Sequence, residues 1–330
     1  MAYTGKENRY DNMEYRYAGA SGLKLPVIAL GLWHNFGTNA DKNTMKQLCF
    51  TAFDQGITYF DLANNYGPEP GSAETNFGEI LATEMSAYRD EMVIATKAGY
   101  GMWQGPYGDW GSRKYLIASL NQSLKRMKLD YVDIFYHHRM DPNTPLEETM
   151  LALADIVRSG KALYVGLSNY DGETMEKASQ LLEEYQVPFI VNQNNYSMFN
   201  DTVEKNGLQK ACTKEKKGMV AFCPLAQGLL STKYLNDIPE DSRIKTSGIF
   251  LKEDAVTPEK LSQIRSLNEI AQNRGQSLAQ MALSYILSRE AMTTALIGAS
   301  KPEQITENVA CLQNMKFSSE ELSQIKKILD

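Results

Sequence analysis

The amino-acid sequence predicts an α/β protein folded as a closed (β/α)8 barrel, the TIM-barrel architecture. Short runs rich in β-branched and aromatic residues recur along the chain of 330 residues. Helical patterns lie between them, and this alternation is typical of parallel strands joined by crossover helices. The runs are almost continuously apolar, as expected for strands buried on both faces. The predicted strands are 26–32, 57–63, 92–99, 131–137, 162–168, 188–194, 219–225 and 294–299.

Two further elements flank this barrel. The stretch 15–26 reads as an N-terminal β-hairpin with its turn near Gly19–Gly22. A long, charged loop is expected from Leu229 to Val256, after the seventh strand, and loops of that length are usually functional. We expect residues 1–330 to form a single domain of this type.

Helix boundaries follow from the spacing of apolar residues. Helices are expected over 112–127 and 144–159, where apolar residues recur at steps of three and four. Ser112 and Thr144 are the predicted N-caps, and Ser72 is the predicted cap of the helix after the second strand.

An open doubly wound sheet is the alternative architecture. That fold would favour a G-x-G-x-x-G sequence at the start of the first helix. The most similar stretch, GYGMWQG at 99–105, has the wrong spacing and does not open a helix. The barrel therefore explains the sequence better.

Composition and charge restrict the classes of partner. The chain is 43% hydrophobic and 22% charged, which is typical of a globular protein. Its net charge of −6 argues against nucleic acid or an anionic membrane as a partner. The four cysteines are scattered, and we found neither a signal-peptide pattern nor a long apolar span. We expect a cytoplasmic protein with a small-molecule substrate; the oligomeric state stays open, with a homo-oligomer among the alternatives.

Polar residues stand where several predicted strands end. They are Asp61, Lys97, His138, Ser168 and Gln193. Active sites of TIM barrels lie at the carboxyl ends of the strands. Because side chains alternate along a strand, Asp61, Lys97 and His138 can all face the barrel interior. The sequence thus predicts an acid, an amine and an imidazole meeting at the barrel mouth.

Tyr66, in the loop after the second strand, adds a phenol to this group. A buried lysine stays charged when an acid is its partner, so Asp61 is expected to hold Lys97 as a cation. We expect cationic Lys97 to lower the pKa of Tyr66 from about 10 and to make it a general acid. A purely structural ion pair is the alternative, but four convergent polar groups favour an active site.

The adjacent histidines His137 and His138 do not suggest a metal site. Neighbouring residues of a strand face opposite ways, so both cannot bind one ion. We expect His138 to be a hydrogen-bond donor in the active site and His137 to face the outer layer.

Seven stretches of the chain match a known pattern: LGLWHNFG (30–37), GITYFDLANNYG (56–67), IATKAG (94–99), LDYVDIFYHHR (129–139), GKALYVGLSNY (160–170), FCPLAQGLLSTKY (222–234) and LIGASKPEQITEN (296–308). Through these stretches the chain resembles the aldo-keto reductase family over nearly its whole length. Within the family it resembles the branch of L-glyceraldehyde 3-phosphate reductase and the voltage-gated potassium channel β-subunits.

This resemblance implies NADPH-dependent reduction of small aldehydes and ketones, with L-glyceraldehyde 3-phosphate or methylglyoxal as the type of substrate. It implies a catalytic tetrad of Asp61, Tyr66, Lys97 and His138, in which Tyr66 is the general acid during hydride transfer from NADPH. The channel β-subunits carry asparagine at the position of His138, so the histidine here favours an enzyme.

The resemblance also assigns binding residues. Those for the cofactor are Gly31, Trp33, Asp61, Ser168, Asn169, Gln193, Phe222, Pro224, Leu225, Gln227, Leu230, Lys233, Arg243, Gly298, Ser300, Lys301, Gln304, Glu307 and Asn308. Those for the substrate pocket are Trp33, His34, Tyr66, Trp103, Tyr107, Trp110, Arg113 and His138.

Gln304 departs from the family pattern. Many members carry an arginine there, and that arginine binds the 2′-phosphate of NADPH. We expect Arg243, Ser300 and Lys301 to replace it, so NADPH remains the predicted cofactor.

Two other functions remain open. The protein could be an NADPH-bound sensor or regulatory subunit, as the channel β-subunits are. It could also be a barrel isomerase or aldolase that uses Lys97 as a Schiff-base amine, although pairing with Asp61 makes Lys97 a poor nucleophile.

Overall fold

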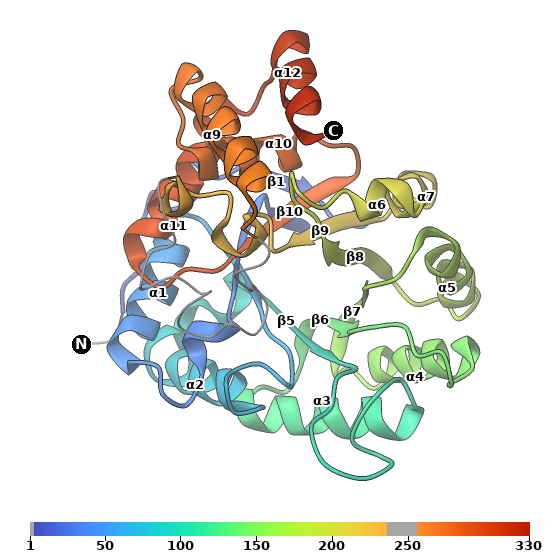
Figure 1. The fold of residues 1–330 in the computed structure, drawn as a ribbon. Helices are drawn as coiled ribbons and strands as arrows, with labels where there is room; N and C mark the ends of the chain where they lie inside the picture. The colour runs from blue at the N-terminus through green and yellow to red at the C-terminus, as the bar shows by residue number, and fades with distance from the viewer. Residues whose placement is uncertain (1–2, 236–255) are drawn as a thin grey trace.

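The computed structural model describes residues 3–235 and 256–330. Eight parallel strands close into a barrel in the order β10-β3-β4-β5-β6-β7-β8-β9, which confirms the predicted fold class. Figure 1 shows the strands near the centre of the molecule, with helices around them. The barrel strands are β3 (Ile28–Gly31), β4 (Tyr59–Asp61), β5 (Val93–Ala98), β6 (Val132–His137), β7 (Ala162–Ser168), β8 (Phe189–Asn195), β9 (Gly218–Phe222) and β10 (Met292–Ile297).

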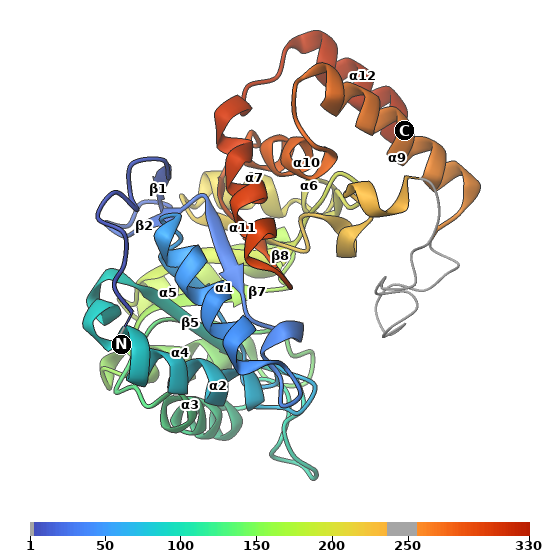
Figure 2. The same cartoon turned by 90° about the vertical axis from the view of Figure 1, so that its left-hand side faces the viewer.

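The helices connect these strands and cover the barrel. They are α1 (Lys42–Asp54), α2 (Ser72–Ile80), α3 (Arg113–Met127), α4 (Leu146–Arg158), α5 (Gly172–Glu184), α6 (Thr202–Lys205), α7 (Leu208–Lys214), α9 (Pro258–Asn273), α10 (Leu278–Leu287), α11 (Pro302–Val309) and α12 (Ser319–Leu329). The short helical turns are η1 (His34–Phe36), η2 (Leu81–Met85), η3 (Ser86–Glu91), η4 (Ala226–Gly228), η5 (Thr232–Tyr234) and η7 (Ala310–Asn314). Helices α9 and α12 pack against each other outside the ring of helices (Figure 2).

The predicted hairpin is confirmed and covers the amino-terminal end of the barrel. Strand β1 (Tyr15–Tyr17) pairs antiparallel with β2 (Lys24–Pro26). In its turn, the Ala20 amide donates to the Lys216 carbonyl, 2.9 Å away, just before β9 begins. Gly19 has φ +60°, and a Cβ there would lie 2.2 Å from that same carbonyl oxygen. The close approach of the turn to the barrel therefore requires glycine at this position.

One of the predicted helix caps is confirmed and two are wrong. The Ser112 side chain accepts a hydrogen bond from the Tyr115 amide at the start of α3. Helix α4 instead begins after Pro145, and the Thr144 hydroxyl donates to Asp141. Ser72 is the first residue of α2, and its hydroxyl donates to the Glu69 carbonyl. The residue before α2 is Gly71, whose φ of 90° is not that of a serine cap.

The predicted long loop Leu229–Val256 falls mostly on residues 236–255, which lie outside the described residues. Its first part contains the short turn η5. Within residues 3–235 and 256–330, no helix combines the length and the apolar character needed to cross a membrane.

The barrel interior is filled by aromatic and aliphatic side chains. Tyr59, Ala95, Ile134 and Tyr136 belong to one buried cluster inside the barrel. A larger cluster lies between the barrel and the helices. Gly166 on β7 leaves room for the Tyr136 ring, because a Cβ at Gly166 would lie 2.3 Å from two atoms of that ring. The interior is thus packed closely enough to require glycine beside a tyrosine.

We expect Gly166→Ala to lower the free energy of unfolding by about 1–3 kcal/mol, because the added methyl group overpacks the barrel against Tyr136. Urea denaturation measures this change. Gly22→Ala is the control: nothing lies within 4 Å of a Cβ at Gly22, so its stability should barely change. Equal stability of both variants would contradict this account of the barrel interior.

Candidate active site

An ion pair between Asp61 and Lys97 lies buried at the mouth of the barrel. Asp61 ends β4 and Lys97 is the penultimate residue of the neighbouring strand β5. The Lys97 ammonium donates to the Asp61 carboxylate and to the Leu62 carbonyl, the latter at 2.6 Å. The Lys97 side chain is 0% exposed and the Asp61 side chain is 1% exposed. Strand parity therefore brings the two charges together, as the sequence predicted.

Tyr66 reaches this pair from the loop after β4. Its hydroxyl lies 3.3 Å from Lys97 Nζ, and its ring centroid lies 4.7 Å from the same nitrogen. The Trp33 ring stacks on Tyr66, with 5.5 Å between the centroids. The Ala73 amide, in α2, donates to the Tyr66 carbonyl. The phenol is thus held between a cation and an aromatic ring.

The expected lowering of the Tyr66 pKa is wrong. Burial raises the pKa of Tyr66 well above its ordinary value of 10.0, and the negative charge of Asp61 raises it further. Burial also lowers the pKa of Lys97, while Asp61 opposes this by favouring the ammonium. The loss of water around the phenol outweighs the attraction of Lys97. Tyr66 therefore keeps its proton at neutral pH, which suits a proton donor.

His138 completes the group from the end of β6. Its amide donates to the Ala98 carbonyl, 2.9 Å away, and its ring meets the Tyr66 ring edge to face at 5.9 Å. Burial, followed by the charge of Lys97, holds the pKa of His138 well below 6.5. The imidazole is therefore neutral, with one nitrogen still able to donate a proton to a carbonyl oxygen.

His137 faces the opposite way, as predicted. Its Nδ1 lies 2.7 Å from the Tyr170 hydroxyl, and the residue is fully buried between strand and helix layers. Burial lowers the pKa of His137 to about 4, so this imidazole is also neutral. Among the described residues, no cluster of three His, Cys, Asp or Glu side chains could hold a metal ion.

Hydrogen bonds inside the barrel fix the Asp61 carboxylate. Gln193 Nε2 donates to Asp61 Oδ1 at 2.9 Å, and the Tyr59 hydroxyl donates to the same oxygen at 3.2 Å. The Tyr59 and Tyr136 hydroxyls are 2.8 Å apart. From the sequence, Gln193 was assigned to the cofactor, and the two tyrosines were not identified. In the sequence they look like core aromatics, because only the folded barrel brings the Tyr59 hydroxyl to Asp61 and the Tyr136 hydroxyl to that of Tyr59.

Glu74 is a second buried acid that we did not predict from the sequence. It is 0% exposed, on α2. It accepts hydrogen bonds from Thr96 on β5 and from Arg126 on α3, the latter at 2.7 Å. Glu74 also favours the charged form of Lys97. Its position on the apolar face of α2, between Ala73 and Phe77, was the available signal.

Several residues predicted for the cofactor lie on the same rim of the barrel, at the ends of its strands. Ser168 ends β7, and Asn169 follows it with a φ of 57°. Asn169 Nδ2 donates to the His138 carbonyl at 2.9 Å and to Ser168 Oγ at 3.2 Å. Phe222 ends β9, and Gly31 ends β3. These strand ends therefore surround the tetrad.

The residues predicted for the rest of the cofactor follow β9 and β10. Pro224, Leu225, Gln227, Leu230 and Lys233 lie in the segment after β9, and Arg243 lies outside the described residues. Gly298, Ser300, Lys301, Gln304, Glu307 and Asn308 lie between β10 and the end of α11.

Gln304 occupies hydrogen-bond donors at the start of α11. Its Oε1 accepts from the Ser300 amide at 2.8 Å, from Ser300 Oγ at 3.2 Å and from the Lys301 amide at 3.3 Å. In this conformation, Gln304 engages the Ser300 hydroxyl and the backbone amides of Ser300 and Lys301.

The predicted aromatic pocket is partly assembled. Trp33 and His34 stack at 4.1 Å beside Tyr66. Trp103, Tyr107 and Trp110 belong to the loop before α3 and are 37%, 56% and 36% exposed. Arg113 is directed toward the neighbouring helix α4, where its guanidinium pairs with Asp155 at 2.5 Å.

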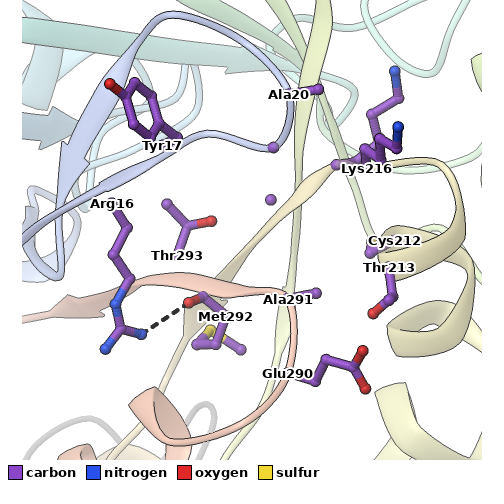
Figure 3. Close-up of a pocket in the computed structure, with 13 residues that line it drawn as sticks. Arg16, Tyr17, Ala20, Cys212, Thr213, Lys216, Glu290, Ala291, Met292 and Thr293 are labelled. Carbon is purple, nitrogen blue, oxygen red and sulfur yellow. Dashed lines mark hydrogen bonds between the residues drawn. The ribbon is translucent and has the colours of Figure 1, made fainter.

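A separate hollow of about 390 Å³ lies at the opposite end of the barrel (Figure 3). Ala20 of the hairpin turn, Lys216 and Thr293 line it, and Arg16 donates to the Met292 carbonyl at its edge. These residues belong to the amino-terminal ends of β9 and β10 and to the hairpin. The hollow is therefore distinct from the tetrad.

Comparison with known proteins identifies similar chains. The family model described as the aldo/keto reductase family matches residues 27–330. L-glyceraldehyde 3-phosphate reductase of Escherichia coli O157:H7 is 55% identical over 330 residues, which cover 98% of this chain and 95% of that protein. A putative voltage-gated potassium channel subunit beta of Schizosaccharomyces pombe is 36% identical over 97% of this chain and 94% of its own length.

A solved structure supports the same relationship. The crystal structure of a thermostable aldo-keto reductase in complex with the inhibitor epalrestat has a TM-score of 0.75 and 28% sequence identity. The match covers 96% of this chain and 100% of that one. The similarity thus extends to the whole barrel.

We expect Lys97→Met to lower the free energy of unfolding by about 3–5 kcal/mol, because it leaves the buried Asp61 carboxylate without its cation. Asp61→Asn combined with Lys97→Met removes both charges and should recover a large part of this loss. Urea denaturation of both variants measures the difference. If adding Asp61→Asn to Lys97→Met instead lowered the stability further, the unpaired charge of Asp61 would not be the cause of the loss in Lys97→Met.

Proposed function

The chain belongs to the aldo/keto reductase family, and we propose that it is an NADPH-dependent reductase of small aldehydes and ketones. It is an oxidoreductase; the cofactor, the substrates and the residue roles are our proposal. The observation that carries the proposal is the convergence of a neutral phenol, a buried lysine–aspartate pair and a neutral imidazole at the barrel mouth. The proposed substrates are L-glyceraldehyde 3-phosphate and methylglyoxal, the former being the substrate in the names of relatives at 55% and 54% identity.

The strand ends provide groups that suit a nicotinamide cofactor. The amides of Asn169 and Gln193 and the hydroxyl of Ser168 offer both donors and acceptors for a carboxamide. The half-buried Phe222 ring offers a flat apolar surface beside them. When bound there, NADPH supplies the hydride for the carbonyl carbon.

Each member of the tetrad has a separate proposed task. Tyr66 gives its proton to the carbonyl oxygen as the carbon accepts the hydride, and the phenolate then regains a proton from solvent. Lys97, 3.3 Å away, stabilises the transient negative charge on the Tyr66 oxygen. Asp61 holds Lys97 in place, and neutral His138 orients the carbonyl oxygen by a hydrogen bond.

The sensor function is the second candidate, and the similarity to a putative channel β-subunit is what favours it. NADPH oxidation with a panel of small aldehydes separates the two functions. Rapid turnover supports the reductase, whereas tight NADPH binding with negligible turnover supports the sensor.

We also infer that residues 1–330 form one domain and that the protein acts in the cytoplasm. The hairpin closes the barrel, and the C-terminal helices α10, α11 and η7 pack together against it, which supports one domain. Cys49, Cys212 and Cys311 are buried thiols without disulfide bonds, as is usual in a reducing compartment.

We expect Tyr66→Phe to lower kcat by about 10²–10⁴-fold, since it removes the proton donor and leaves the ring stacked on Trp33. Steady-state NADPH oxidation measures kcat, and quenching of tryptophan fluorescence measures NADPH affinity, which should stay within about twofold. Full activity of Tyr66→Phe would refute the role of the phenol.

We expect Gln304→Arg to increase the preference for NADPH over NADH by about tenfold or more. The substitution frees the donors of Ser300 and Lys301 and adds a cation for a 2′-phosphate. The ratio of kcat/KM with the two cofactors measures the preference. Gln313→Arg, which adds the same charge at an exposed position of η7, is the control. An unchanged ratio in Gln304→Arg would exclude Gln304 from cofactor discrimination.

A further inference from the structure

The loop 99–111 between β5 and α3, here called the aromatic loop, presents Trp103, Tyr107 and Trp110 to solvent, and its Tyr100 ring packs on His138 of the tetrad. Four residues of this loop contact Arg139, the residue that follows His138. This arginine took no part in the function derived above, although it is only 22% exposed.

Arg139 contacts both ends of the aromatic loop. Its Nε donates to the Gly99 carbonyl at 2.8 Å, and its Nη2 donates to Asp109 Oδ1 at 2.7 Å. The guanidinium carbon lies 4.3 Å from the Tyr100 ring centroid and 3.6 Å from the Trp110 ring centroid. A planar group that donates in two directions and stacks on two rings can be supplied by arginine, not by lysine.

The same contacts reach the tetrad and constrain the backbone. The Tyr100 ring packs edge to face on His138, with 4.6 Å between the centroids. Trp110 has a φ of +70°, which is costly for a tryptophan. Its amide is held by the Gly99 carbonyl and by Asp109, the two groups that also bind Arg139. Arg139 therefore supports a strained loop conformation next to His138.

We propose that Arg139 is a positioning residue that fixes the aromatic loop over the barrel mouth and thereby sets which carbonyl substrates the site accepts. This proposal rests on the reductase function proposed above. Arg139 is not assigned to anion binding, because Asp109 neutralises it and two rings enclose it.

The proposal separates substrates by their size. We expect a three-carbon carbonyl compound such as methylglyoxal to contact Tyr66 and His138 without reaching the loop. An aryl aldehyde is larger, and we expect it to gain affinity by stacking on the exposed rings of the loop. Loss of loop order should therefore raise KM for the aryl aldehyde and leave the smaller substrate almost unaffected.

The test compares Arg139→Lys with wild-type protein, using NADPH and either methylglyoxal or 4-nitrobenzaldehyde. We expect kcat/KM for 4-nitrobenzaldehyde to fall by about tenfold, mainly through KM, and that for methylglyoxal to change less than about threefold. Asp109→Asn should shift both values in the same direction by a smaller factor. Arg158→Lys is the matched control, since Arg158 is 52% exposed on α4 and pairs with Asp155.

Loop order has its own readout. Two of the three tryptophans of the chain lie in the aromatic loop, so acrylamide quenching of tryptophan fluorescence should increase in Arg139→Lys and not in Arg158→Lys. If Arg139→Lys does not fold, acrylamide quenching of Asp109→Asn takes its place, since Asp109→Asn removes the charge that pairs with Arg139.

The outcomes distinguish the two proposals. If wild-type protein oxidises NADPH with neither aldehyde, the reductase function fails. If wild-type protein is active and Arg139→Lys keeps the ratio of the two kcat/KM values within about twofold, the role of Arg139 in specificity is overturned. An equal fall of kcat with both substrates would also overturn the role of Arg139 in specificity, because the substitution would then affect the tetrad and not the choice of substrate.

Discussion

The buried ion pair of Asp61 and Lys97 is the interaction on which the barrel mouth depends. Removing two charges from water costs several kcal/mol for each ion, so the pair persists only where other polar groups satisfy it. The Leu62 carbonyl accepts from Lys97, and Gln193 and Tyr59 donate to Asp61. Tyr59 and Asp61 belong to β4, Lys97 to β5 and Gln193 to β8, while Leu62 lies in the loop after β4. The chemistry of the site therefore requires the closed barrel.

The same burial fixes the protonation states around the pair. Loss of water keeps the Tyr66 phenol protonated, and it keeps the His138 imidazole neutral. In the proposed mechanism, Lys97 therefore contributes less by ionising Tyr66 in the resting state than by stabilising negative charge on the Tyr66 oxygen during reaction. A phenol that stays neutral until the substrate is reduced is a proton donor over a wide range of pH.

The sequence was sufficient to predict the barrel and the meeting of Asp61, Lys97 and His138 at its mouth, because both follow from periodicity; the catalytic roles of these residues and of Tyr66 stay a prediction. Apolar runs gave the strands, and alternation placed Asp61 and Lys97 on one face. The N-cap at Thr144 and the pKa direction of Tyr66 were wrong for different reasons. At the start of α4, Pro145 takes the capping position in place of Thr144. The pKa of Tyr66 is raised mainly by burial, which is a property of the whole fold. Arg139 was not found because its partners become neighbours only in the folded chain.

In the two proposals, the consecutive residues His138 and Arg139 after β6 divide chemistry from specificity. The His138 amide binds the Ala98 carbonyl, and the Arg139 side chain binds the next carbonyl, that of Gly99. The last residue of β5 and the residue after it therefore carry the backbone acceptors for both residues, while Lys97 on the same strand contacts the Tyr66 hydroxyl. Since strands are more rigid than loops, this arrangement fixes the tetrad independently of the aromatic loop. We therefore expect substitutions in the loop to alter substrate choice with little effect on the ion pair.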